Sequence, residues 1–158
     1  MYEYIKRNLV RQDRGFQVLG MLLAEEFAQL RERDPQAVTA TEFSIHELLR
    51  QLAVEREEVR ELLGGEKLIQ YATRLPKTTA EELLGLAETV SRREQTSIRQ
   101  AERNADFAFA LLDQSKAMLG FLHDKVTEQV TPKNTNTYSA AGAYKNVRPN
   151  AALLRGTL

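Results

Sequence analysis

The stretch Ala105–Leu122, with the sequence ADFAFALLDQSKAMLGFL, carries more apolar surface than one seam of a small helical bundle needs. If this stretch is helical, at about 100° per residue, its large apolar side chains cover an arc of roughly 240°. A stripe that faces a core needs only about 100° or a little more. Either this helix packs between several neighbours, or part of its apolar surface binds a partner.

The composition around this stretch is that of one ordinary globular domain, with 42% hydrophobic and 28% charged residues in a chain of 158. Cysteine is absent, which excludes disulfides and a cysteine nucleophile and suits a reducing compartment. The N-terminal sequence lacks the apolar run of a secretory signal, and no apolar run approaches the ~20 residues of a membrane span. We therefore expect a cytoplasmic protein that does not insert into membranes.

The formal net charge is zero, but the charges are unevenly distributed along the chain. Residues 1–130 carry a net charge of −4, whereas residues 131–158 carry +4 and contain no acidic side chain. Binding to nucleic acid needs a clustered basic face on the folded domain. The acidic main part of the chain therefore argues against nucleic acid as the ligand.

The first third of the chain places apolar side chains at three- and four-residue steps between charged and polar residues. This pattern predicts a long amphipathic helix from about Ile5 to Leu30, continuous through its two glycines. Asp34-Pro35 marks a break, because proline disfavours helix in the preceding residue. We expect an irregular connection from there through Thr41.

A second helix is predicted to begin at Ser44, which has capping-box spacing to Glu47. Gly64-Gly65 is a suitable stop for this helix, since glycine commonly follows the last helical turn. A shorter helical piece is expected over residues 66–75, ending at Pro76.

The longest helical region is predicted to begin at Thr79 and to run, with a bend near Ser91, to about Val126. A seven-residue recurrence in it is typical of a coiled-coil-like seam. The residues of this predicted seam are Ile98, Ala105, Leu112, Leu119 and Val126.

The fold class that follows is all-α. We expect an antiparallel helical bundle of about three long helices with a short connecting helix, although the loop lengths also allow an extended hairpin with a third, longer helix. The bundle should cover residues 1–130. Residues 131–158 lack a sustained apolar period and are predicted to form a flexible C-terminal tail.

Candidate catalytic groups are few. The two histidines, His46 and His123, have no second histidine at metal-ligand spacing, and no phosphate-binding glycine loop is present. Pairs of adjacent carboxylates point to different parts of a helix surface and read as solvated faces. We expect no catalytic residue, no cofactor and no metal. Histidine phosphotransfer through His46 remains an alternative, but the residues after His46 lack the basic side chain and glycine typical of that family.

A specific pattern of polar and apolar residues runs from Gln100 to Gly142. It consists of Asn104, Leu111-Leu112, Ser115, Phe121-Leu122, Thr137-Tyr138 and Gly142. This pattern resembles the FlgN family of flagellar type III export chaperones, and the chain length and helical layout fit that family as well. One departure is the three-residue separation of Tyr138 from Gly142, which is looser than in some members.

The resemblance implies a cytoplasmic chaperone without enzyme activity. Its clients would be the C-terminal amphipathic segments of hook-associated proteins, which form the hook–filament junction, and the export apparatus is a further partner that this role allows. Binding would keep the clients soluble and competent for export. The residues expected to bind the client are Asn104, Phe107, Leu111, Leu112, Met118, Leu119, Phe121, Leu122 and Tyr138.

Two other interpretations stay open at this stage. The apolar residues of the stretch could belong to the core, or they could form the seam of a structural coiled-coil adaptor or oligomerisation module. Large exposed apolar patches are unusual on monomers. We therefore expect the chain's own tail or a second copy, as a homodimer, to cover the surface when no client is bound.

Overall fold

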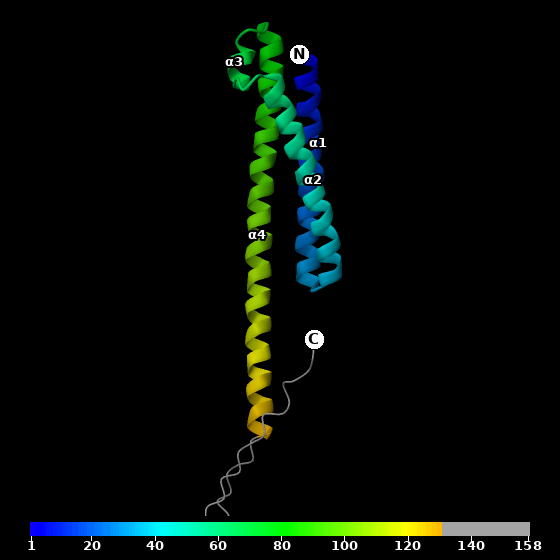
Figure 1. Ribbon diagram of the computed structural model, residues 1–158, viewed down its shortest axis with the longest axis vertical. Helices are drawn as coiled ribbons and strands as arrows, with labels where there is room; N and C mark the ends of the chain where they lie inside the picture. The colour runs from blue at the N-terminus through cyan, green and yellow to red at the C-terminus, as the bar shows by residue number, and fades with distance from the viewer. Residues whose placement is uncertain (131–158) are drawn as a thin grey trace, which may run out of the picture. The chain divides into compact units, whose positions relative to one another are not determined.

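The computed structural model describes residues 1–130, and these residues are helical along most of their length (Figure 1). The predicted all-α class is confirmed, and no strand occurs within the described part. Contacts divide the described chain into two units, the first covering Met1–Ala110 and the second beginning at Leu111. The predicted flexible tail, residues 131–158, lies outside the described residues. The helices are α1 Tyr2–Glu32, α2 Pro35–Leu62, α3 Leu68–Ala72 and α4 Lys77–Val130.

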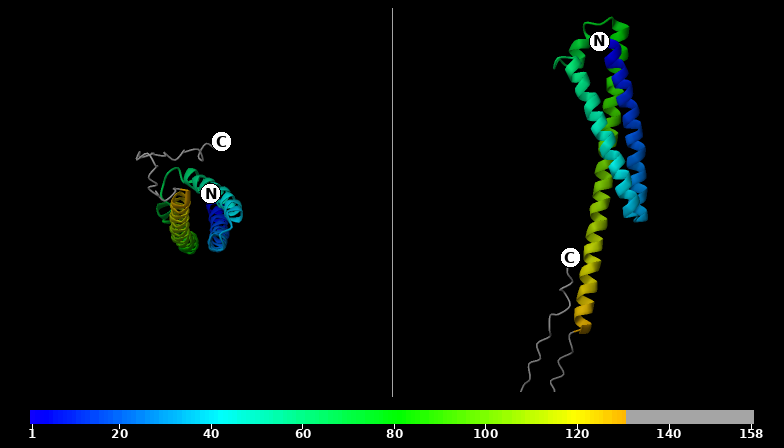
Figure 2. Two further views of the ribbon diagram at one scale, coloured as in Figure 1. Left: turned by 90° about the horizontal axis from the view of Figure 1, so that it is seen from below. Right: turned by 45° about the vertical axis from the view of Figure 1, so that its right-hand side comes forward.

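In the first unit, α1, α2 and the beginning of α4 lie side by side, as both views in Figure 2 show. The helix α2 runs antiparallel to α1, because Asn8 near the start of α1 bonds to Glu55 near the end of α2. The helix α4 runs parallel to α1: Arg93 pairs with Asp13, and Asn104 bonds to the Leu23 carbonyl further along.

The core of this unit consists of two apolar clusters. One cluster lies toward the α1–α2 turn, and the other lies at the opposite end, where Tyr71 of α3 joins it. Leu83 of α4 and Ile5 of α1 are 0% exposed and are the most deeply buried apolar side chains among the described residues. The first cluster contains Phe16, Leu19, Leu23, Ile45, Leu52 and Val90, and the second contains Ile5, Leu9, Val59, Tyr71 and Leu83.

The turn between α1 and α2 is much shorter than the sequence predicts. Arg33 ends α1 in the left-handed region (φ 57°), and Asp34 caps α2 by accepting hydrogen bonds from the backbone of Gln36 and Ala37. Pro35 occupies the first helical position, where its missing N–H costs nothing. The predicted irregular connection through Thr41 is therefore wrong.

The predicted start of α2 at Ser44 is also wrong, because α2 already begins at Pro35. Ser44 lies inside the helix, and its hydroxyl donates to the Ala40 carbonyl one turn earlier. Serine favours caps because it can bond to a free backbone amide. Within α2 that amide is already used, so the capping role belongs to Asp34.

Replacing Asp34 with alanine should lower the free energy of unfolding by about 1 kcal/mol, because two backbone amides lose their acceptor. Ser44→Ala is the matched control and should leave stability within about 0.5 kcal/mol of the wild type or raise it slightly. Urea unfolding followed by circular dichroism measures both variants. A larger loss for Ser44→Ala would contradict the assignment of the helix start.

The helix α1 continues through both of its glycines, as predicted, but the two positions differ in their surroundings. A Cβ atom on Gly15 would lie 2.7 Å from Leu52 Cδ2 of α2, so glycine permits close approach of the two helices. A Cβ atom on Gly20 would meet no other atom within 4 Å. Gly20 therefore has no packing role that requires glycine.

Gly20→Ala should stabilise the protein by about 1 kcal/mol, the difference in helix propensity between the two residues. Gly15→Ala should gain less or lose stability, because Leu52 must move to admit the methyl group. The comparison uses the midpoint of thermal unfolding of the two variants under one buffer condition. Equal stabilisation at both positions would show that the helices are not closely packed at Gly15.

The end of α2 agrees with the sequence analysis. Gly64 and Gly65 follow the helix with positive φ angles of 59° and 82°, which other residues rarely adopt. The short helical piece predicted over residues 66–75 is present as α3, with fewer residues. The helix α4 then begins two residues before the predicted Thr79 and is one continuous helix through Ser91, where a bend was expected.

The buried side of α4 differs from the predicted seam by one residue. Four positions at seven-residue steps are buried, and the last two are polar: Leu83, Val90, Ser97 and Asn104. The predicted seam residue Ile98 is instead 50% exposed, and Ala105 is also exposed. The prediction chose the more apolar of two adjacent positions, whereas the structure buries the polar one, and Asn104 is hydrogen-bonded where it is buried.

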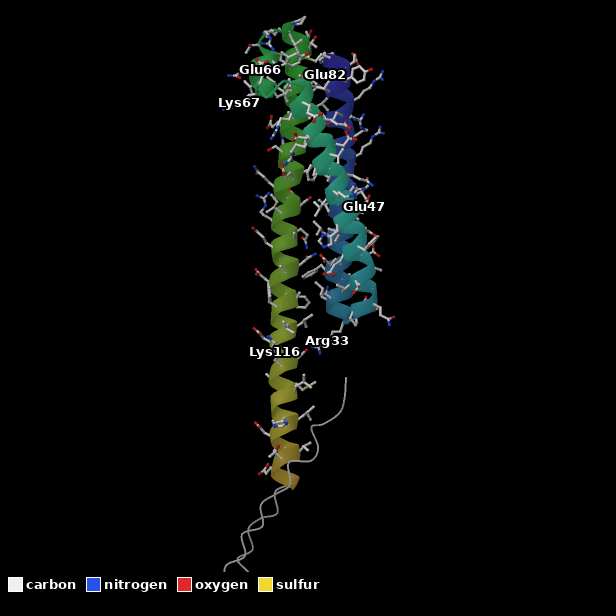
Figure 3. The ribbon with its side chains drawn as sticks, in the orientation of Figure 1. Arg33, Glu47, Glu66, Lys67, Glu82 and Lys116 are labelled. Atoms are coloured by element: carbon white, nitrogen blue, oxygen red, sulfur yellow. The ribbon has the colours of Figure 1, made fainter. Side chains whose placement is uncertain are left out.

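A cluster of three polar side chains, Tyr2, Lys6 and Glu82, connects α1 to α4 at the start of the bundle. Lys6 Nζ lies 2.5 Å from Glu82 Oε1, and the Tyr2 hydroxyl donates to Glu82 Oε2 at 2.5 Å; Figure 3 labels Glu82 there. The hydrogen bond from Lys6, followed by that from Tyr2, lowers the pKa of the Glu82 carboxyl. The ion pair therefore adds to the free energy of unfolding at pH values above the ordinary pKa of a glutamate carboxyl. This contribution is lost as the pH falls through the lowered pKa, and it is small because the side chains are exposed.

Candidate functional site

The second unit presents a row of exposed apolar side chains on α4. From Leu112 to Glu128 every described side chain is exposed. Side chains of this size are normally the ones that a helix buries. The large apolar members and their exposed fractions are Leu112 (48%), Met118 (59%), Leu119 (67%), Phe121 (60%), Leu122 (51%) and Val126 (59%).

These side chains share one side of the helix. At about 100° per residue, the arc from Phe121 through Met118 to Leu112 is roughly 180° wide. The opposite side carries Asp113 and Lys116, and Figure 3 labels Lys116. This part of α4 is therefore amphipathic, and its apolar side is open.

Local contacts stabilise the helix here and leave most of its apolar side exposed. Lys125 pairs with Glu128 at 2.9 Å and lies 5.9 Å from the centre of the Phe121 ring. The Ser115 hydroxyl donates to the Leu111 carbonyl within the helix. Each of these contacts joins residues three or four positions apart in the helix. The apolar surface therefore remains available to a partner.

The sequence-predicted client residue Asn104 belongs to the first unit and is 3% exposed. Its amide donates to the Leu23 carbonyl at 2.7 Å and to Glu26 Oε2 at 2.6 Å, and it accepts a hydrogen bond from Gln100 at 2.8 Å. All of these partners belong to the bundle. The geometry thus gives Asn104 a role in holding α4 against α1.

Asn104→Ala should lower the free energy of unfolding by about 1–3 kcal/mol, because the Leu23 carbonyl and the Glu26 carboxylate lose a buried donor. Urea unfolding measures this loss. Binding of a partner to residues 111–126, measured below the unfolding transition, should be unchanged. Loss of binding without loss of stability would instead make Asn104 a contact residue.

Two further predicted residues are partly covered. Phe107 packs against Phe27 of α1, with ring centres 5.4 Å apart, and Leu111 is half-buried. Tyr138 lies outside the described residues. The structure therefore brings together five of the predicted residues as an exposed set: Leu112, Met118, Leu119, Phe121 and Leu122.

Val126 extends this exposed set and was not among the predicted client residues. It follows Leu119 by seven residues, so the recurrence that predicted a seam also contained the signal for it. Phe109, in the first unit, is 66% exposed and was also left out of that list. Its place in the wide apolar arc of residues 105–122 was the available signal.

An apolar groove of about 310 Å³ lies within the first unit, among α1, α2 and α4. Phe16, Leu19 and Leu52 line it, together with the small residues Ser97 and Ala101 of α4. Arg56 and Glu94 form an ion pair at its edge, 2.8 Å long. This groove is separate from the exposed set of the second unit.

The described residues hold little that resembles a reaction centre. No group of three or more histidine, aspartate or glutamate side chains in residues 1–130 could hold a metal ion. His46 is an exposed residue of α2. No helix in this part of the chain has an apolar segment long enough to cross a membrane.

An exposed apolar side of a helix is a surface suited to the binding of an amphipathic helix. The family model for the FlgN protein matches residues 1–146, and the chain belongs to the FlgN family. It is accordingly a flagellar export chaperone, a protein that binds substrates of the flagellar export system. No curated protein and no solved structure matches the chain significantly.

Proposed function

We propose that this chaperone binds the C-terminal amphipathic segments of hook-associated proteins through the exposed apolar side of α4. The observation that carries the proposal is the set of large side chains between Leu112 and Val126, each about half exposed or more. The chaperone would act in the cytoplasm, before export, and would release its client at the export apparatus.

The physical basis is the complementarity of two amphipathic helices. A client that polymerises through terminal helices has apolar side chains that must be covered before assembly. Laying such a helix against residues 111–126 covers both apolar sides, and a few large anchors supply most of the affinity. Phe121 and Met118 suit this role because their side chains are long and are about 60% exposed.

The client segment would become helical as it binds. Ordering a disordered segment costs free energy, which the burial of apolar surface must exceed. A negative heat-capacity change accompanies that burial and identifies it experimentally. The activity would involve no catalytic residue, cofactor or metal.

Calorimetric titration of the full chain with C-terminal peptides from hook-associated proteins of the same organism tests the proposal. We expect one-to-one binding at micromolar or tighter affinity, with a negative heat-capacity change. Absence of binding by every such peptide, with the helical circular dichroism signal intact, would contradict the choice of client.

Sedimentation equilibrium separates this proposal from a coiled-coil adaptor, which would use the same apolar side to bind a second copy of the chain. For a chaperone, any self-association should disappear when the client peptide is added, because both compete for one surface. An oligomer that persists at saturating peptide would favour the adaptor.

A further inference from the structure

The outer side of α1 carries a second pattern, separate from the exposed apolar set of α4. Six residues at alternating three- and four-residue steps lie on it: Tyr4, Arg7, Arg11, Arg14, Val18 and Met21. At about 100° per residue they fall within an arc of roughly 100°, nearly opposite the buried side of α1. We call these six residues the arginine strip.

The apolar members of the strip lie at its two ends and are open. Tyr4 is 70% exposed at one end, and Val18 (47%) and Met21 (71%) are exposed at the other. Three arginines separate them. The strip therefore offers positive charge at its centre and apolar surface at both ends.

The charges of the strip are only partly neutralised. Arg11 pairs with Glu55 of α2, with both of its hydrogen bonds 2.6 Å long. Within residues 1–130, neither Arg7 nor Arg14 has an ion pair or hydrogen bond from its side chain, and both are exposed. Two cations about 10 Å apart along the helix axis are therefore available to a ligand.

The geometry points to an acidic amphipathic helix of another protein as the partner of the arginine strip. Two carboxylates seven residues apart on that helix would match the spacing of Arg7 and Arg14. Apolar side chains beyond each carboxylate would contact Tyr4 at one end and Met21 at the other. Arg11, held by Glu55, would contribute its hydrocarbon stem to the contact.

Other anionic ligands fit the strip less well. Residues 1–110 contain 19 acidic and 16 basic side chains, so a nucleic-acid backbone would meet net repulsion outside the strip. The apolar side chains are split between the two ends, which gives no continuous stripe to enter a lipid surface. A partner helix with carboxylates between two apolar ends would match both the arginines of the strip and the apolar side chains at its ends.

The probe for this surface is a designed helical peptide with two glutamates seven residues apart and leucines on the same side at both ends. A peptide with glutamines in place of the glutamates is its control. By fluorescence anisotropy at low salt, the full chain should bind the glutamate peptide at least about tenfold more tightly than the glutamine peptide. Added salt should reduce this difference.

A charge exchange gives the sharper test. The double variant Arg7→Glu, Arg14→Glu should lose about tenfold or more in affinity for the glutamate peptide and should prefer a lysine version of it. Arg99→Glu, which reverses an exposed arginine of α4, is the matched control and should bind like the wild type. Arg7→Gln with Arg14→Gln provides a milder second variant, and circular dichroism checks the fold of each.

Three results would overturn the inference: equal affinity for the glutamate and glutamine peptides, an equal loss in Arg99→Glu, or Arg7-dependent binding to phosphatidylglycerol vesicles without binding of the peptide. The inference does not rest on the proposed client. Titration of the same double variant with hook-associated peptides should give wild-type affinity, so the two proposals fail or succeed separately.

Discussion

Replacing Phe121 with aspartate is expected to weaken the binding of a hook-associated C-terminal peptide by about thirtyfold or more. The ring is 60% exposed on the apolar side of α4, where a large aromatic side chain can enter a partner helix surface. Truncating such an anchor typically costs 2 kcal/mol or more of binding free energy, which corresponds to about thirtyfold in affinity. A buried aspartate adds a desolvation cost to that loss.

Phe43→Asp is the matched control for this variant. Phe43 lies on α2 in the first unit and is 76% exposed, so the same substitution changes charge and hydropathy on another surface. It should leave peptide affinity unchanged. Both variants should keep the helical circular dichroism signal. Similar losses in both, or unfolding of Phe121→Asp, would remove the ring from the binding surface.

Leu83→Ala is expected to have the largest effect on stability, a loss of about 2–5 kcal/mol in the free energy of unfolding. Leu83 is 0% exposed and packs in the cluster that joins α1, α2, α3 and α4. Removal of its side chain leaves a cavity that closely packed neighbours fill only in part. Urea unfolding gives this value by linear extrapolation.

Met118→Ala provides the comparison within the same helix. Its side chain is 59% exposed, so the substitution should change the free energy of unfolding by no more than about 0.5 kcal/mol. Peptide affinity should nevertheless fall. A stability loss comparable to that of Leu83→Ala would mean that Met118 belongs to a core rather than to a binding surface.

The sequence was sufficient for the helical class and for several boundaries, because local chemistry determines them. The glycines after α2 carry positive φ angles that other residues avoid, and the apolar steps of α1 continue through its own glycines. The start of α2 was harder to predict. Both Asp34 and Ser44 can cap a helix, and the choice depends on which backbone amides remain free once the turn has formed.

The buried side of α4 was misassigned because its partners are distant in sequence. Apolar periodicity favours Ile98 and Ala105 over their neighbours. The structure buries Ser97 and Asn104 instead, and the Asn104 amide finds the Leu23 carbonyl 81 residues away. A side-chain amide can be buried at low free-energy cost only when it has hydrogen-bond partners. The pattern of residue types along the sequence does not reveal those partners.

The predicted apolar arc agrees with the exposed side chains of α4 more closely than the predicted seam agrees with its buried side. The wide apolar arc already indicated that residues 105–122 exceed the needs of one seam, and Leu112–Leu122 are exposed in the structure. Residues near the beginning of that arc, such as Phe107, are partly covered by α1. The arginine strip of α1 was not predicted, because apolar periodicity assigns charged positions to solvent.

Methyl NMR of the full chain during titration with a hook-associated C-terminal peptide tests the central claim most directly. The account predicts that methyl signals of Leu112, Leu119 and Val126 shift on binding, whereas those of the buried Leu83 and Val90 do not. Shifts confined to the groove of the first unit, at Leu49 and Ile98, together with unchanged signals from residues 112–126, would contradict it.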